Sequence, residues 1–220
     1  YTLHGDEPLL VQEAADAIRA AARAAGFSER TSHTVSGANF DWSDVLALLP
    51  KNRDATVAEL SVGYRIPRQI MELAARLLPT AAPQQTPPTA VREGDAEPRI
   101  IKTSREQLFA AVAKEARTLV AELATGRVGI VCPDNLVDAL SSSLESNGVK
   151  FGRAGASALE APLTVVPVSL VKGLEMDGVV VVEPTDIYES VDAGPRGLYV
   201  ALTRSTQRLV VVHSRELPVE

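Results

Sequence analysis

An arginine stands near the end of the chain, where a short helical stretch meets an apolar strand. Residues 197–214 read GLYVALTRSTQRLVVVHS, and Arg204 follows the helical part directly. A guanidinium group stays charged, and its planar fork can donate to two phosphoryl oxygens at once. An arginine in the last turn of a helix also stabilises the helix dipole and often does nothing more. The rest of the sequence is needed to choose between a phosphate-binding role and a structural role for Arg204.

Two further segments place polar residues in a comparable setting. Residues 166–184 read VPVSLVKGLEMDGVVVVEP and put Gly173 and Glu175 in a loop between apolar strands. Residues 59–78 read ELSVGYRIPRQIMELAARLL and put Arg65 just before the helix that begins at Pro67. Taken singly, Arg65 is compatible with a solvated loop arginine and Glu175 with an ordinary loop carboxylate.

In this order, the three segments resemble motifs IV, V and VI of superfamily-1 helicases of the UvrD and Rep type. The resemblance covers residues 41–220, and the amino-acid sequence of motifs V and VI is most similar to the HelD branch. HelD proteins are helicase-like ATPases that act on bacterial RNA polymerase. The resemblance implies a C-terminal RecA-like (2A) domain with a P-loop-NTPase-like fold. Its implied partner is a complementary RecA-like domain or RNA polymerase.

The same resemblance implies roles for four residues. In this family ATP lies between two RecA-like domains, and the second domain supplies arginines that reach the γ-phosphate. Arg65 and Arg204 match these arginine-finger positions and are the candidate catalytic residues. Glu175 matches the carboxylate near the ribose, and Gly173 permits close approach of the backbone. All four are candidate nucleotide-binding residues, because charge spreads over the γ-phosphoryl oxygens in the transition state.

The chain also departs from the family. Pro167 and Ser169 stand where these helicases usually carry a Thr and a His that couple nucleotide to the nucleic-acid strand. The sequence holds no G-x-x-x-x-G-K-[ST] motif, and no predicted strand ends in the paired acids that hold magnesium. We therefore expect half of an ATP site that is not an autonomous ATPase, requires no cofactor, and binds ATP or ADP weakly at most. Weak or no DNA binding is expected of the chain alone.

Residues 1–46 resemble a different family, the beginning of the δ subunit of bacterial DNA polymerase III, an AAA+-like clamp-loader subunit that does not hydrolyse ATP. Residues 4–8, HGDEP, occupy the place of a phosphate loop but carry two acids and no lysine, so they would repel a triphosphate. We expect a chimera, natural or engineered, in which a β-α-β segment at 1–46 packs with a RecA-like domain at 47–220. A divergent helicase domain is the alternative to a chimera.

Three functions follow from these resemblances. The first is a helicase-derived RecA-like domain, and the second is a folded chimera without activity of its own. The third is a clamp-loader δ-like protein-interaction module in DNA replication.

Composition limits the other classes of protein. The 220 residues carry a formal net charge of −6, which gives no global field to attract DNA. One cysteine, Cys132, and three scattered histidines offer no metal-ligand spacing, so no metal site is expected. The apolar runs are far shorter than the roughly 20 residues of a membrane helix. We expect a cytoplasmic protein of one domain, or two at most.

Periodicity predicts the elements that position the candidate residues. Helices are expected at 8–27, within 39–49, and at 67–79, 104–126 and 135–148; strands are expected at 30–36, 55–62, 99–103, 128–133, 163–170, 178–184 and 208–214. The proline-rich stretch 79–98 reads as a loop or linker and is the one plausible boundary. Continuous valine runs indicate strands covered on both faces. The predicted fold class is α/β, with a doubly wound, mostly parallel sheet in a RecA-like three-layer architecture.

Overall fold

The computed structural model of the chain describes residues 8–27, 62–83, 85–154 and 161–219, with side chains described from residue 15 onward. The chain divides into two units, residues 1–58 and 59–220. The predicted domain bounds at 46 and 47, the strand at 30–36 and the helix within 39–49 lie outside the described residues. These bounds therefore stay predictions.

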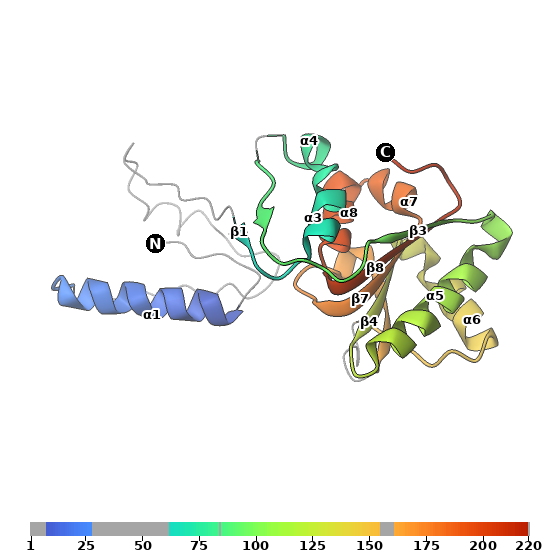
Figure 1. Cartoon of the computed structure of the whole chain (residues 1–220), viewed down its shortest axis with the longest axis horizontal. Helices are drawn as coiled ribbons and strands as arrows, with labels where there is room; N and C mark the ends of the chain where they lie inside the picture. The colour runs from blue at the N-terminus through green and yellow to red at the C-terminus, as the bar shows by residue number, and fades with distance from the viewer. Residues whose placement is uncertain (1–7, 28–61, 84, 155–160, 220) are drawn as a thin grey trace. The chain divides into compact units, whose positions relative to one another are not determined.

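The described part of the first unit is the helix α1, Pro8–Ala24, which confirms the helix expected there (Figure 1). Gly26, at a φ of +87°, ends it, and the amide of Phe27 donates to the carbonyl of Ala22 at 3.1 Å. A glycine in the left-handed region commonly ends a helix in this way. From residue 15 to 27 no side chain is buried.

The second unit is built around a six-stranded sheet in which every neighbouring pair is parallel (Figure 1). The spatial order is β3-β8-β7-β4-β6-β5. The strands are β3 Arg99–Lys102, β4 Val128–Cys132, β5 Gly152–Arg153, β6 Leu163–Pro167, β7 Met176–Val182 and β8 Ser205–His213. This confirms the predicted fold class, a doubly wound parallel sheet.

Helices cover both faces of this sheet. One face packs against two helices, α5, Leu108–Leu123, and α6, Val137–Ser146. The other face packs against α3, Arg68–Ala75, α4, Leu78–Ala81, and α8, Gly194–Leu202. The short helix α7, Pro184–Tyr188, lies beside α8. Along β7 the buried valines alternate between the two cores, with Val180 facing α5 and Val179 and Val181 facing α8. Successive side chains of a strand point to opposite faces, so a run of valines supplies both cores.

Short 3-10 turns replace parts of the predicted elements. Turns at Arg105–Gln107 and Asp134–Leu136 precede α5 and α6, and a third at Val168–Leu170 follows β6. Ser104 takes the cap position before the first turn, but its side chain makes no capping hydrogen bond there. The strand expected at 163–170 ends at Pro167, because a proline has no amide hydrogen to continue the ladder.

Residues 89–95, within the predicted proline-rich loop, form what we call the strap. Its first residues make β2, Thr89–Ala90, which pairs in parallel with β1, Val62–Gly63. Further on, Glu93 accepts two hydrogen bonds from Arg68 at 2.8 and 3.0 Å. Asp95 pairs with Arg208 of β8. The strap therefore joins β1, α3 and β8 of the second unit.

Candidate functional site

Three distant segments meet where β7 and β8 begin. Glu175 immediately precedes β7, and Arg204 immediately precedes β8. The two strands are parallel neighbours with Met176 opposite Ser205, so both residues lie at the amino-terminal edge of the sheet. Arg65 comes from the loop after β1, and its Nη1 forms an ion pair with Oε1 of Glu175. The structure thus brings together the candidate residues of all three motifs.

Arg204 is almost completely buried, with 7% of the residue exposed. Its Nε donates to the carbonyl of Val200 at 3.1 Å, and its Nη1 donates to the carbonyl of Leu174 at 3.5 Å. The carbonyl of Arg204 in turn accepts from the amide of Met176 at 3.1 Å. Arg204 therefore has a structural role, because it links the end of α8 to the loop that carries Glu175.

The ion pair between Arg65 and Glu175 is only partly shielded from water. Their side chains are 26% and 39% exposed, so the pair adds little to folding stability. A ligand that offers an anion to Arg65 or a donor to Glu175 would replace one partner of this pair rather than enter an empty site.

Gly173 occupies the left-handed region at a φ of +82°, two residues before Glu175. A Cβ built on it would meet no atom within 4 Å. The backbone conformation, not lack of room, therefore requires glycine at this position. The open space leaves the backbone accessible to a ligand.

Two residues that sequence reasoning missed complete the site. Nη1 of Arg92 donates to the carbonyl of Arg65 at 2.9 Å and to the carbonyl of Thr206 at 2.8 Å. Arg92 lies on the strap, and nothing in that proline-rich stretch links it to motif IV or VI. The other residue is Tyr64, next to Arg65, which is 75% exposed. A tyrosine directly before the candidate Arg65 was a signal available in the sequence.

The described part of the chain gives little support for a metal site or for a cysteine nucleophile. No three His, Cys, Asp or Glu side chains come together there as metal ligands. Burial, with a smaller contribution from the charge of Asp134, raises the pKa of the Cys132 thiol to about 12, so it is not a thiolate nucleophile. None of the described helices is both long and apolar enough to cross a membrane.

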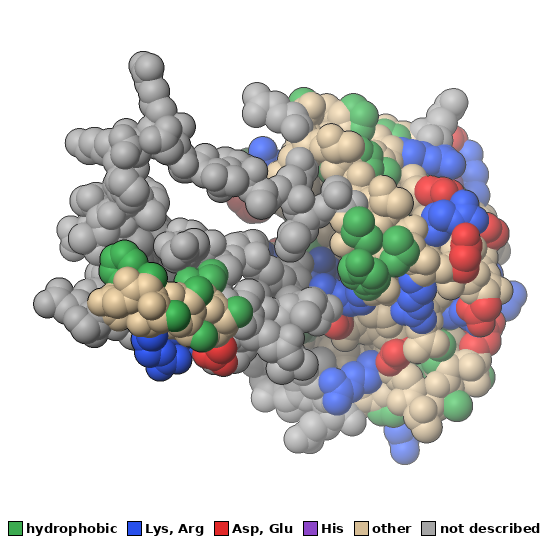
Figure 2. Space-filling view, turned by 60° about the vertical axis from the view of Figure 1, so that its left-hand side comes forward, with side chains coloured by type: hydrophobic (Ala, Val, Ile, Leu, Met, Phe, Trp, Pro, Cys, Tyr) green, Lys and Arg blue, Asp and Glu red, His purple; other side chains and the backbone are tan. Residues whose placement is uncertain are grey.

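Charge is mixed on the visible face of the second unit. On the face shown in Figure 2, acidic and basic side chains are interspersed and form no continuous basic surface. A nucleic-acid contact on that face would have to be local, because a broad basic surface is the usual footprint of such binding.

The comparisons with known proteins bear on the fold. No family model matches the chain, and no curated protein matches it. Among solved structures, the C-terminal domain of a possible DNA helicase from Lactobacillus plantarum WCFS1 aligns with a TM-score of 0.56 and 22% identity, over 70% of this chain and 89% of that one. The second unit has the RecA-like α/β fold seen in helicase domains.

Two looser matches add no argument. The helicase domain of Pyrococcus furiosus Hef gives a TM-score of 0.35 at 14% identity, over 49% of this chain and 26% of that one. The SWI2/SNF2 ATPase core of Sulfolobus solfataricus, solved with double-stranded DNA, gives 0.39 at 12% identity, over 72% of this chain and 35% of that one.

Proposed function

We propose that the chain supplies the arginine half of an ATP site, as the C-terminal RecA-like domain of a superfamily-1 helicase does, and does not turn over ATP by itself. The observation that carries this proposal is the meeting of Arg65, Glu175 and Arg204 at one edge of the sheet. These residues come from three segments that are far apart in the sequence, and each resembles a helicase motif.

Each side chain has a task that its chemistry suits. The guanidinium groups of Arg65 and Arg204 stabilise the charge that spreads over the γ-phosphoryl oxygens. The carboxylate of Glu175 accepts a hydrogen bond from a ribose hydroxyl once Arg65 has turned from it to the phosphate. Tyr64 offers an exposed ring on which a base can stack. ATP itself supplies the phosphoanhydride bond that a complete site would break.

The chain requires a second domain for catalysis. Without a phosphate-loop lysine in the sequence, the arginines have no positioned phosphate on which to act. The complementary surface would belong to another RecA-like domain. The HelD-like ancestry, RNA polymerase as the larger partner and the δ-like origin of residues 1–46 rest on sequence resemblance alone.

Thermal melting with nucleotides tests this proposal. We expect about 5 mM MgATP to raise the melting temperature by about 1–3 °C, because a ligand that binds the folded state stabilises it. MgAMP, which keeps the base and the ribose but lacks the γ-phosphate, should give a clearly smaller rise. Arg65→Lys and Arg204→Lys should both lose the ATP effect, since an ammonium group lacks the planar fork. Arg76→Lys, an exposed arginine on α3's end, is the matched control and should keep it.

Two results would contradict the proposal. Equal shifts with ATP and AMP would mean that the arginines do not read the γ-phosphate. Steady phosphate release above background that disappears in Arg204→Ala would mean that the chain is an ATPase on its own.

A further inference from the structure

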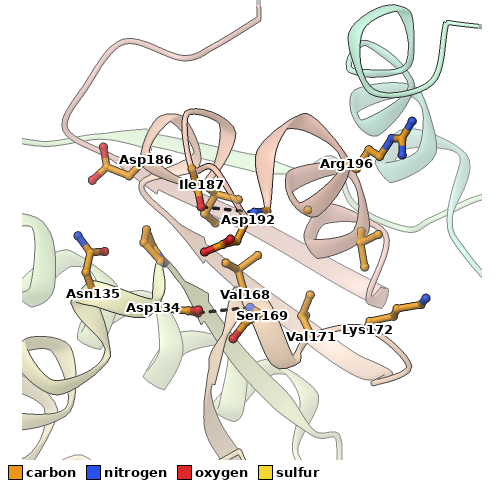
Figure 3. Close-up of a pocket in the computed structure, with 15 residues that line it drawn as sticks. Asp134, Asn135, Val168, Ser169, Val171, Lys172, Asp186, Ile187, Asp192 and Arg196 are labelled. Atoms are coloured by element: carbon orange, nitrogen blue, oxygen red, sulfur yellow. Dashed lines mark hydrogen bonds between the residues drawn. The ribbon is translucent and has the colours of Figure 1, made fainter. Parts of the chain in front are cut away.

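A pocket of the described structure is lined by none of the arginine-site residues. It measures about 600 Å³ and is formed by the segments that follow β4, β6 and β7, at the carboxyl ends of these strands (Figure 3). None of the four predicted site residues lines it. Ligands of open α/β sheets commonly bind at the carboxyl ends of the strands.

The floor of this pocket is apolar. Val168, Val171 and Ile187 line it, and each is less than a tenth exposed. Val200 and Gly197 of α8 continue the floor. An apolar side chain that enters here removes hydrocarbon surface from water, which favours binding.

Three carboxylates line the pocket; Asp186 pairs with Arg215, and the other two stand over the floor. Asp134 comes from the turn after β4 and Asp192 from the loop between α7 and α8, and Figure 3 shows them projecting over the pocket from different elements. Both are exposed, and Oδ1 of Asp134 accepts a hydrogen bond from the amide of Ser169 at 3.3 Å. A carboxylate pair beside an apolar surface attracts an ammonium or guanidinium group and repels phosphate.

The basic residues of the pocket lie to the other side. Figure 3 shows Lys172 and Arg196 extending away from the two carboxylates. Nε of Arg196 donates to the carbonyl of Ala81 at 2.8 Å, which directs this side chain towards α4. The carboxylates therefore dominate the charge at the centre of the pocket.

Exposed apolar residues border the pocket on two segments. Leu170, between two lining residues of the turn after β6, is 48% exposed, and Val191, between Ser190 and Asp192, is fully exposed. Single exposed apolar residues are common on protein surfaces, but next to an apolar pocket they add to the hydrocarbon surface that a partner could cover. An apolar centre with a charged rim is the usual layout of a protein interface.

We propose that this pocket binds a segment of a partner protein in which an apolar side chain is flanked by arginine or lysine. The apolar side chain fills the floor over Val168 and Ile187. The flanking cation pairs with Asp134 and Asp192. This proposal does not depend on nucleotide binding, because the two sites share no residue.

A nuclear magnetic resonance titration of the full chain tests it with two synthetic peptides. One is acetyl-Gly-Arg-Leu-Arg-Gly-amide, and the other replaces both arginines by glutamate. We expect the basic peptide to shift the amide signals of Ser169, Asp192 and Gly197 with a dissociation constant of about 1 mM, and the acidic peptide to leave them unchanged. Asp134→Asn with Asp192→Asn should weaken binding at least about fivefold.

The control is Glu145→Gln, which removes one negative charge, as each single aspartate change does, from an exposed position on α6 outside the pocket and should leave the affinity unchanged. Equal binding of both peptides, or no shift with either, would overturn the proposal. So would signals that move on dilution of the chain alone, which would identify a second copy as the occupant. Stronger binding of a short oligothymidylate at the same amides would also overturn it.

Discussion

The two ends of the central sheet carry sites of different construction. At the amino-terminal edge, Arg65, Arg92 and Arg204 are each bonded to other parts of the chain, through a carboxylate or through backbone carbonyls. At the carboxyl edge, Asp134 and Asp192 are exposed and stand over a floor that belongs to the core.

This difference separates two ways of making a site. Arg204 is nearly buried and donates to two backbone carbonyls, so its substitution is expected to disturb both folding and binding, whereas substitution of the more exposed Arg65 or Arg92 should affect chiefly binding. Asp134 and Asp192 are exposed, and Asp134 accepts a hydrogen bond at 3.3 Å from the amide of Ser169, so their substitution is expected to change binding more than stability. Surface substitutions that touch no buried partner usually alter stability by less than about 0.5 kcal/mol.

The largest expected effect is that of Arg204→Ala. The change removes donors from the partly buried carbonyls of Val200 and Leu174, and hydrogen bonds from a charged group typically contribute about 2 kcal/mol. We expect a loss of about 2 kcal/mol in the free energy of unfolding, measured with urea. Asp192→Asn at the other end should cost less than about 0.5 kcal/mol. Similar losses in the free energy of unfolding for the two variants would mean that the residues at both ends of the sheet support the fold equally.

A second prediction uses a pair of glycines, one at each end. Gly173, before β7, and Gly194, at the start of α8, both have positive φ, and a Cβ on either would meet no atom within 4 Å. We expect Gly173→Ala and Gly194→Ala to cost about 1 kcal/mol each, because an L-residue is strained in that region. Urea unfolding measures the cost.

The ligand responses of these variants sharpen the comparison. Gly173→Ala should weaken the ATP-dependent rise in melting temperature and spare the peptide titration. Gly194→Ala should do the reverse. If either variant weakened both responses, the two sites would be coupled through the sheet.

A third and smaller effect is expected for Arg92→Gln. The guanidinium of Arg92 joins the backbone of Arg65 to that of Thr206, and the residue is exposed, so its loss should cost about 1 kcal/mol or less. Its effect on nucleotide binding should be larger than its effect on stability, since Arg65 would no longer be held beside Glu175. Loss of the ATP response with nearly unchanged urea unfolding is the expected result. An unchanged ATP response would limit Arg92 to a structural role.

The smallest predicted effect concerns acid. Arg208 lowers the pKa of Asp95 below its usual value of 3.8, and Arg68 lowers the pKa of Glu93 below 4.5, in both cases chiefly through a hydrogen bond. A lowered pKa in the folded state adds stability that is present above the unfolded value and lost as the pH falls through the folded value. Asp95→Asn should therefore melt slightly below the unmodified chain at about pH 6, and the difference should shrink as the pH falls below 3.8. A difference that persisted in acid would show that the strap is not held by these pairs.

The sequence was sufficient for five of the six strands of the sheet, because their signal is local, but the two-residue strand β5 was not predicted. The valine runs of β7 and β8 mark strands that are buried on both faces, and the structure has them there. The 3-10 turn at Arg105–Gln107 was not predictable, because the same residues suit the first turn of an α-helix. Tertiary contacts decide between the two forms.

The residues of the two candidate sites could likewise be predicted only where the local sequence carries a signal. Arg65, Glu175 and Arg204 could be named as candidates because the sequence around each resembles a helicase motif. Their roles stay predictions. Arg92 could not be named, because its two bonds reach residues that are distant in the sequence. The pocket was missed for the same reason, since Asp134 and Asp192 belong to no motif and come together only through the parallel crossovers of the sheet.

The single cysteine makes the centre of the sheet observable without any substitution. Cys132 ends β4, a strand paired with neighbours on both sides, and it is completely buried. A thiol that is inaccessible and protonated reacts with an alkylating reagent only after the strand has opened. When the reagent captures every opening, the labelling rate equals the opening rate of β4. The labelling rate of Cys132 thus reports the opening of the strand at the centre of the sheet.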